Sequence, residues 1–276
     1  MIKTNCELPN TLLEYNNELN DYDFVLFHLY KTDNIYKDYF KRQRSDHPER
    51  IMILDNSAYE FYIKGEELDL DEFYKSIVDL QPNYYILPDV LMDKEKTINN
   101  TKEFMDKYYN LINYESPNSK PMAVLQGDSE NDFEECANIY KKMGIWSIAI
   151  PFHNTFFKNR LPDIKIGVEF AIHYNPTDDV RYAMGRVDYI LKNYEKYLFQ
   201  FKHIHILGSH CPLEKIFYNI CQTMDTGYPV KLGMKGEQLL KESKKPNIII
   251  DEFLNDDLDP YIRERIILNV MKFKGL

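Results

Sequence analysis

Short apolar runs alternate along this chain with longer helical patterns, and this alternation limits the folds open to it. Six runs rich in β-branched and aromatic residues have the length of strands, at residues 23–28, 51–54, 84–87, 122–126, 147–150 and 203–207. Helical periodicity falls between such runs at residues 94–111, 130–143, 179–198 and 212–220. Strands that alternate with helices indicate βαβ units and a parallel sheet.

The length of the chain favours one large α/β domain. Its strand runs are almost continuously apolar, as in a sheet covered on both faces, and its 276 residues suffice for a barrel of about 250. We therefore expect a single-domain TIM-type (β/α)8 barrel over residues 1–276. A seventh strand is expected at residues 222–225, and an eighth near the N-terminus or around residues 247–250. Residues 151–176 are expected to form an elaborated loop near the barrel mouth, and Trp146 to lie in the core.

An open doubly wound sheet would show similar alternation. Such sheets often bind nucleotide cofactors through a glycine-rich turn after the first strand. This sequence has no such turn and no GxxxxGK[ST] phosphate loop. We therefore favour the barrel and expect no cofactor.

Charge and cysteine usage restrict the partners and the compartment. A net charge of −10 disfavours generic binding to a phosphate backbone. Basic segments at residues 41–44 and 241–245 could dock a nucleic acid locally, but a solvated helix face or loop explains each more simply. The four cysteines lack CxxC spacing, no secretory signal precedes them, and no apolar stretch approaches the roughly 20 residues that span a bilayer. We expect a cytoplasmic protein with no membrane partner.

Five of the apolar runs end in a polar residue or a tight turn. The segments are Leu54-Asp55-Asn56-Ser57, Leu87-Pro88-Asp89, Leu125-Gln126-Gly127, Leu207-Gly208-Ser209 and Met224-Asp225-Thr226-Gly227. In a parallel barrel these strand ends converge on one mouth, where a partly desolvated carboxylate can act as nucleophile, acid or acceptor. Each aspartate taken singly is more simply a helix cap or a turn former. Three at successive strand ends favour an active site.

The amide and the glycines at these ends suit a heterocyclic ligand. Gln126 can donate and accept hydrogen bonds at once, as recognition of a base edge or a sugar requires. Gly127 allows a ligand or backbone to come close, and Gly208 after Leu207 removes a side chain in the same way.

Together, these strand ends resemble the tRNA-guanine transglycosylase superfamily, TIM-barrel enzymes that exchange guanine in a nucleic acid for a 7-deazaguanine. The order and spacing of five segments between about residues 50 and 235 carry the resemblance. The segment led by Asp55 is similar to the family's D-S-G-G-F-Q, and Leu87-Pro88-Asp89 matches its second strand-end aspartate. The remaining matches are Val124-Leu125-Gln126-Gly127 to V-Q-G, His205-Ile206-Leu207-Gly208 with Pro212 and Glu214 to L-M-G-x-G-x-P, and Met224-Asp225 to the segment with the nucleophilic aspartate.

The resemblance implies a role for each of these residues. Asp225 would be the nucleophile that forms a covalent aspartyl-sugar intermediate, and Asp55 the general acid and base. The substrate-binding residues would be Asp89, Gln126, Gly127, Leu207, Gly208, Ser57 and Tyr59, with the Tyr59 ring able to stack. The partners would be a nucleic acid and a free 7-deazaguanine base, with no metal, and homodimer formation stays open.

The sequence also departs from the family pattern. Ser57 and Ala58 replace two glycines after the first aspartate, and Glu60 replaces the following glutamine, which alters the pocket near the sugar or base. The C-terminal CxCxxC and histidine zinc site of the tRNA enzymes is absent. The zinc-less outline is more similar to the phage branch that places a 7-deazaguanine into DNA, so DNA is expected ahead of tRNA.

Two other functions stay open at this point. His203 and His205 alternate on one strand face, a spacing found among the ligands of metal-dependent barrel hydrolases, although either ring could be a core histidine. The chain would then hydrolyse a small molecule. The substituted glycines also allow a non-catalytic barrel that binds nucleic acid through its loops.

Overall fold

The chain folds as an α/β TIM-type (β/α)8 barrel, as the alternation of runs predicts. The computed structural model describes residues 2–152, 154–160, 178–239, 246, 248 and 250–275. Eight parallel strands follow the order β1-β8-β7-β6-β5-β4-β3-β2. By their contacts the residues form two units, the terminal unit (Met1–Asp21, Asp128–Glu130 and Ile150–Leu276) and the central unit (Tyr22–Gly127 and Asn131–Ala149).

All seven strands placed by the apolar runs are present, within a few residues of the expected bounds. The strands are β1 (Lys3–Cys6), β2 (Asp23–Leu26), β3 (Met52–Asp55), β4 (Tyr84–Ile86), β5 (Lys120–Val124), β6 (Ser147–Ile150), β7 (His203–Ile206) and β8 (Thr223–Thr226). The eighth strand is the N-terminal β1, which pairs in parallel with β8. The other candidate, residues 247–250, falls partly outside the described residues.

Helices follow most strands. The α-helices are α1 (Asn16–Leu19), α2 (Phe27–Thr32), α3 (Asn34–Asp46), α4 (Ala58–Lys64), α5 (Leu70–Leu80), α6 (Lys94–Glu115), α7 (Glu130–Lys142), α8 (Thr155–Asn159), α10 (Asp178–Tyr194), α11 (Tyr228–Met234) and α12 (Pro260–Gly275). The 3-10 segments are η1 (Asn10–Tyr15), η3 (Leu198–Gln200), η4 (Pro212–Phe217) and η5 (Ile250–Phe253). No helix in these described stretches has the length and apolarity needed to cross a membrane.

Three expectations need correction or restriction. The helix expected at residues 212–220 is the shorter 3-10 segment η4, closed by i to i+3 bonds such as Tyr218 N to Lys215 O (3.2 Å). Trp146 is 41% exposed rather than buried, because the turn after α7 directs the neighbouring Ile145 into the core instead. The loop expected at residues 151–176 lies largely outside the described residues, which here include α8.

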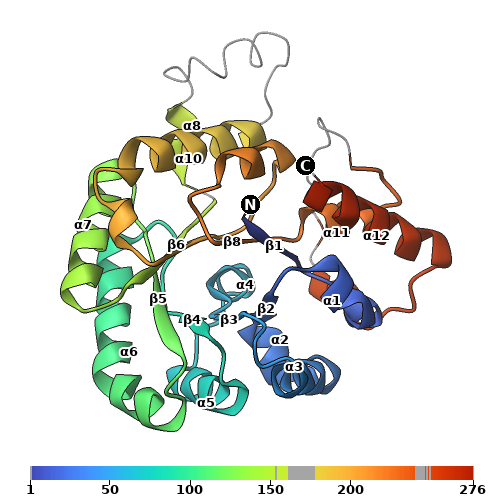
Figure 1. Ribbon diagram of the computed structural model, residues 1–276, viewed down its shortest axis with the longest axis horizontal. Coiled ribbons are helices and arrows are strands. Elements are labelled where there is room, and N and C mark those ends of the chain that lie inside the picture. The colour runs from blue at the N-terminus through green and yellow to red at the C-terminus, as the bar shows by residue number, and fades with distance from the viewer. Residues whose placement is uncertain are drawn as a thin grey trace. The chain divides into compact units, whose positions relative to one another are not determined.

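In the central unit, helices cover the outer face of the strands. Figure 1 shows α5 and α6 outside β4 and β5. Aromatic rings fill the space between, with Phe73 centred 5.1 Å from Phe27 and 5.7 Å from Phe104. An aspartate caps the N-terminus of each helix: Asp69 accepts from Glu72 N before α5, and Asp93 from Lys96 N before α6. The strand ends that carry the candidate residues therefore stand on a packed scaffold.

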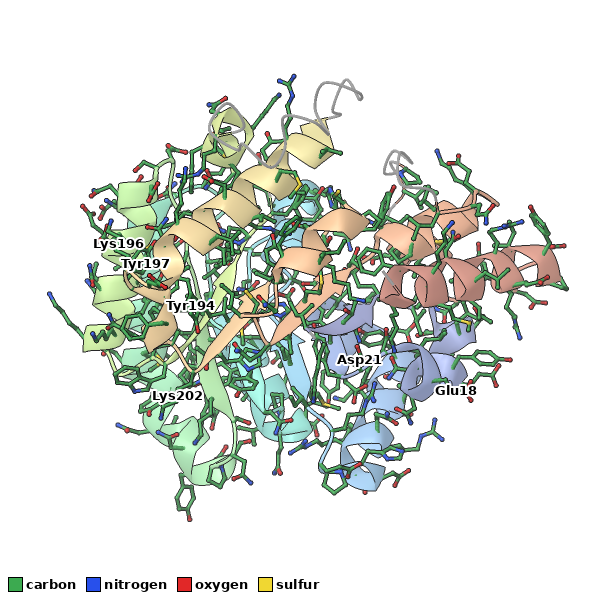
Figure 2. The ribbon with its side chains drawn as sticks, turned by 45° about the horizontal axis from the view of Figure 1, so that its top comes forward. Glu18, Asp21, Tyr194, Lys196, Tyr197 and Lys202 are labelled. Carbon is green, nitrogen blue, oxygen red and sulfur yellow. The ribbon has the colours of Figure 1, made fainter. Side chains whose placement is uncertain are left out.

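In the terminal unit, strand alternation puts polar residues of β7 and β8 on one face. His205 lies opposite Thr223 in the parallel register, and Asp225 lies opposite Asn5 of β1. Since side chains alternate along a strand, His203 and His205 share a face, as do Thr223 and Asp225. Figure 2 shows Tyr194 and Tyr197 where α10 ends, with Lys202 just before β7.

Candidate functional site

Polar strand ends of the central unit hold a hydrogen-bonded cluster, which we call the Asp89 cluster: Asn56, Asp89, Met92 and Gln126. The Asn56 side-chain amide donates to Leu87 O (2.7 Å) and to Asp89 Oδ1 (2.8 Å). From the next strand end, Gln126 Nε2 donates to Asp89 Oδ2 (2.7 Å). Both carboxylate oxygens of Asp89 are therefore bound by neutral amides.

The orientations of both amides are fixed by their other atoms. Gln126 Oε1 accepts from the backbone N–H of Met92 (2.9 Å), so its amide nitrogen must face Asp89. Asn56 Oδ1 accepts from the N–H of Ala58 (2.8 Å), which sets its amide in the same way. Met92 adopts a left-handed conformation with φ of 60°, an uncommon one for a residue other than glycine. The chain therefore holds an unfavourable backbone conformation at this position.

The charge of Asp89 is disfavoured by its surroundings. Desolvation raises the pKa of its carboxyl group above the usual value, and the hydrogen bonds from Asn56 and Gln126 only partly oppose this. A desolvated carboxylate of this kind is a strong hydrogen-bond acceptor for a ligand that presents N–H donors.

Asp55 is buried at the end of β3 and shapes the turn that follows. Its Oδ2 accepts from the N–H of Ser57 (2.7 Å), and Ser57 is left-handed with φ of 59°. The Ser57 hydroxyl accepts from His28 N (3.2 Å) and lies 2.9 Å from His28 Nδ1. Ser57 is fully buried, so its side chain helps to hold the turn.

Tyr59 and Gly127 follow two of these strand ends in the sequence. Tyr59, on α4, is 43% exposed, so its ring can meet a ligand from solvent. Gly127 has a φ of 140°, and a Cβ there would lie 2.4 Å from Cβ of Asp132. Only glycine fits at this approach between the strand end and α7.

Asp225 is the centre of a second cluster, in the terminal unit, which we call the Asp225 cluster: His203, His205, Gly208, Thr223 and Asp225. Asp225 is the third residue of β8, one residue before the strand ends, and is buried. Its Oδ1 accepts from the backbone N–H of Gly208 (2.9 Å) and lies 3.1 Å from His205 Nε2. Gly208 has a φ of 57°. Among the described residues, both partners of the carboxylate bind the same oxygen.

The two histidines meet a single hydroxyl group. Thr223 Oγ1 lies 2.9 Å from His205 Nδ1 and 2.7 Å from His203 Nε2. Desolvation, reinforced by His205 and Lys3, lowers the pKa of His203 to about 3, which keeps this ring neutral. Within the described ranges, no group of three or more His, Cys, Asp or Glu side chains is arranged to hold a metal ion.

A buried ion pair, Arg186 with Glu214, holds the loop beside Asp225. The Arg186 guanidinium lies 2.9 Å from Glu214 Oε2 and donates to the carbonyls of Leu207 and Gly208, both at 2.7 Å. Both side chains are fully buried. Leu207 thus contributes its carbonyl to the loop, whereas its side chain is only half-buried. Sequence analysis assigns no role to Arg186, although a charged residue on the buried side of a helical pattern is a usable signal.

The predicted site residues therefore fall into two groups. Asp89 and Gln126 are brought together in the Asp89 cluster with Asn56, to which sequence analysis assigns no role. Asp55 directly precedes Asn56 in the chain, and its carboxylate binds the N–H of Ser57. Gly208 and Asp225 are joined in the Asp225 cluster by a direct hydrogen bond.

No model of a protein family matches the sequence, and no curated protein matches it significantly.

Proposed function

We propose that this protein is a base-exchange transglycosylase, which replaces guanine in a nucleic acid by a free 7-deazaguanine through a covalent aspartyl-sugar intermediate. DNA is proposed ahead of tRNA on the resemblance to the zinc-less branch of the superfamily. The target nucleotide has to leave the base stack, at a cost of a few kcal/mol in a duplex.

The geometry of Asp225 is the observation that carries this function. A carboxylate nucleophile needs one oxygen free to attack C1′, while donors on the other oxygen keep the group in place. Among the residues that the structure describes, Asp225 has this arrangement, with His205 and Gly208 both on Oδ1. The bond from C1′ to guanine N9 breaks as the bond from Oδ2 to C1′ forms. The incoming base then attacks C1′ of the intermediate on the face of the sugar that guanine has left, opposite Asp225.

Asp55 is proposed as the acid and base of the two half-reactions. As a carboxylic acid it protonates the departing guanine, and as a carboxylate it takes the N9 proton of the incoming base. Atoms and charge then balance over the exchange, with no metal or oxidant consumed.

The Asp89 cluster supports recognition of the base. Guanine and 7-deazaguanine share a donor edge with N1–H and an exocyclic amine, which suits a carboxylate acceptor. Asp89 is oriented by the two amides that donate to it, and desolvation raises its pKa in spite of them, so further donors from a base edge would favour its ionised form. Tyr59 offers an exposed ring for stacking.

A labelled-base assay tests this function. The protein is incubated with radiolabelled guanine and, separately, single-stranded DNA, duplex DNA or tRNA, and label in the polymer is counted. We expect label in DNA, released again by a chase with a 7-deazaguanine. Asp225→Asn should lower incorporation at least about a thousandfold, whereas the exposed control Asp106→Asn should not. Label in none of the polymers, or an Asp225→Asn variant as active as the parent, would refute the proposed function.

A further inference from the structure

Four buried side chains on neighbouring strands form a continuous hydrogen-bonded chain that ends at Asp225. The contacts run from His203 Nε2 to Thr223 Oγ1 (2.7 Å), from Thr223 Oγ1 to His205 Nδ1 (2.9 Å), and from His205 Nε2 to Asp225 Oδ1 (3.1 Å). All four residues are at most 4% exposed, so water does not compete for these contacts. We propose that His205 is a positioning residue that binds Oδ1 of Asp225 and thereby makes Oδ2 the oxygen that reacts. This role rests on the proposed function.

The donors and acceptors of the chain define where the protons lie. An ionised Asp225 can only accept, so His205 Nε2 must carry a proton and donate it to Oδ1. In one arrangement His205 Nδ1 accepts from the Thr223 hydroxyl, which in turn accepts from His203 Nε2–H. In the other, His205 is an imidazolium that donates to Thr223, and the hydroxyl donates to His203. His205 donates to Asp225 in both, and His203 is neutral in both, in keeping with its lowered pKa.

A second donor reaches the same oxygen from the backbone. The N–H of Gly208 donates to Oδ1 (2.9 Å), and Arg186 holds the loop in place through the carbonyls on either side of this position. Two donors of different origin, a side chain on β7 and a backbone amide after it, therefore converge on one carboxylate oxygen. Oδ2 is the oxygen that neither of them binds.

This asymmetry suits both halves of a double displacement. When Oδ2 bonds to C1′, Oδ1 becomes the carbonyl oxygen of an ester and loses most of its charge. When the incoming base attacks C1′, the bond from Oδ2 to C1′ breaks and the carboxylate regains its charge. Donors already aimed at Oδ1 stabilise this developing charge without rearranging.

The first test reads the protons directly and needs no substrate. In protein labelled with 15N-histidine, the ring correlations of His205 are assigned by their loss in His205→Gln. We expect Nε2 of His205 to carry a proton. We also expect Thr223→Val to shift Nδ1 of His205 while Nε2 stays protonated, and Thr223→Ser to restore the parent Nδ1 resonance. An unprotonated Nε2 in the parent would overturn the positioning role.

The second test compares a variant that removes the donor with one that keeps it. His205→Phe has no donor, whereas the amide nitrogen of His205→Gln reaches about as far as Nε2. With a labelled oligonucleotide and a denaturing quench, we expect His205→Phe to form the covalent intermediate about a hundredfold more slowly. We expect His205→Gln to stay within about tenfold of the parent, and the KM for the free base to be unchanged in both. His47→Phe, at a half-exposed histidine, is the matched control.

The outcomes separate the two claims. A parent chain that exchanges no base refutes the proposed function and with it the role of His205. A parent that exchanges base, with His205→Phe as fast as the parent, or with His205→Gln no faster than His205→Phe, overturns the role of His205 alone. Rates are taken per folded molecule from thermal denaturation, so a variant that merely unfolds is recognised as such.

Discussion

Asp89 and Asp225 are both carboxylates that the fold holds at strand ends, but they are held in different ways. Asp89 is bound on both oxygens by the side-chain amides of Asn56 and Gln126. Within the part of the chain that the structure describes, Asp225 is bound on one oxygen, by His205 and the N–H of Gly208. A carboxylate held on both oxygens presents a fixed acceptor, whereas one held on a single oxygen keeps the other for a bond to carbon. This difference supports the roles proposed for the two residues, recognition for Asp89 and covalent chemistry for Asp225.

The largest expected effect comes from the support behind Asp225. Arg186 and Glu214 are fully buried, so Arg186→Met leaves an uncompensated charge and frees the carbonyls of Leu207 and Gly208. We expect a loss of about 3–5 kcal/mol in the free energy of unfolding, measured by urea denaturation.

Two further variants make this result specific. The double variant Arg186→Met with Glu214→Leu should be clearly less destabilised than the single one, because no charge stays buried alone. Arg263→Met is the control, since its 3.8 Å contact with Glu14 is partly exposed, and should change the free energy by less than about 1 kcal/mol. If Arg186→Met loses no more stability than Arg263→Met, the ion pair does not support the loop.

The strands were predictable because each is a local pattern of apolar residues. The exception, β1 (Lys3–Cys6), has the polar residues Thr4 and Asn5 at its centre, and it is a strand only because it pairs with β8 more than 200 residues later in the chain. Trp146 was predicted wrongly because composition places tryptophan inside, whereas one turn of backbone decides between it and Ile145.

The site was predictable in its aspartates but not in its supports. Asp55, Asp89 and Gln126 follow apolar runs, and the structure joins Asp89 and Gln126 in one cluster, whose member Asn56 directly follows Asp55 in the chain. The charge of Arg186 on the buried side of its helix is a signal in the sequence, but its role appears only when Glu214 meets it from a distant segment. Such a pairing depends on tertiary contacts, which no local pattern encodes.

The next effect in size compares the same substitution at the two aspartates. Asn at position 225 can still accept at Oδ1 from His205 and Gly208. The free energy of unfolding of Asp225→Asn should therefore lie within about 0.5 kcal/mol of that of the parent. Asn at position 89 places an NH2 group against the amide nitrogen of Asn56 or Gln126. Neither amide can turn without losing a backbone partner, so Asp89→Asn should cost about 1–3 kcal/mol. Equal urea midpoints for the two variants would contradict the difference in how Asp89 and Asp225 are held.

The smallest expected effect is a pH dependence that belongs to Asp89. Its folded pKa is raised, chiefly by desolvation, so between the unfolded pKa of about 3.9 and the raised folded value the native state binds more protons than the unfolded chain. The parent therefore gains stability from this group as the pH falls through that window, and Asp89→Asn does not. Urea denaturation from pH 7 to 4 should show that the free energy of unfolding of Asp89→Asn falls further below that of the parent as the pH falls. If the difference in free energy of unfolding narrows instead, the two amides lower the pKa of Asp89 more than burial raises it. Asp89 would then resemble an ordinary ionised surface carboxylate.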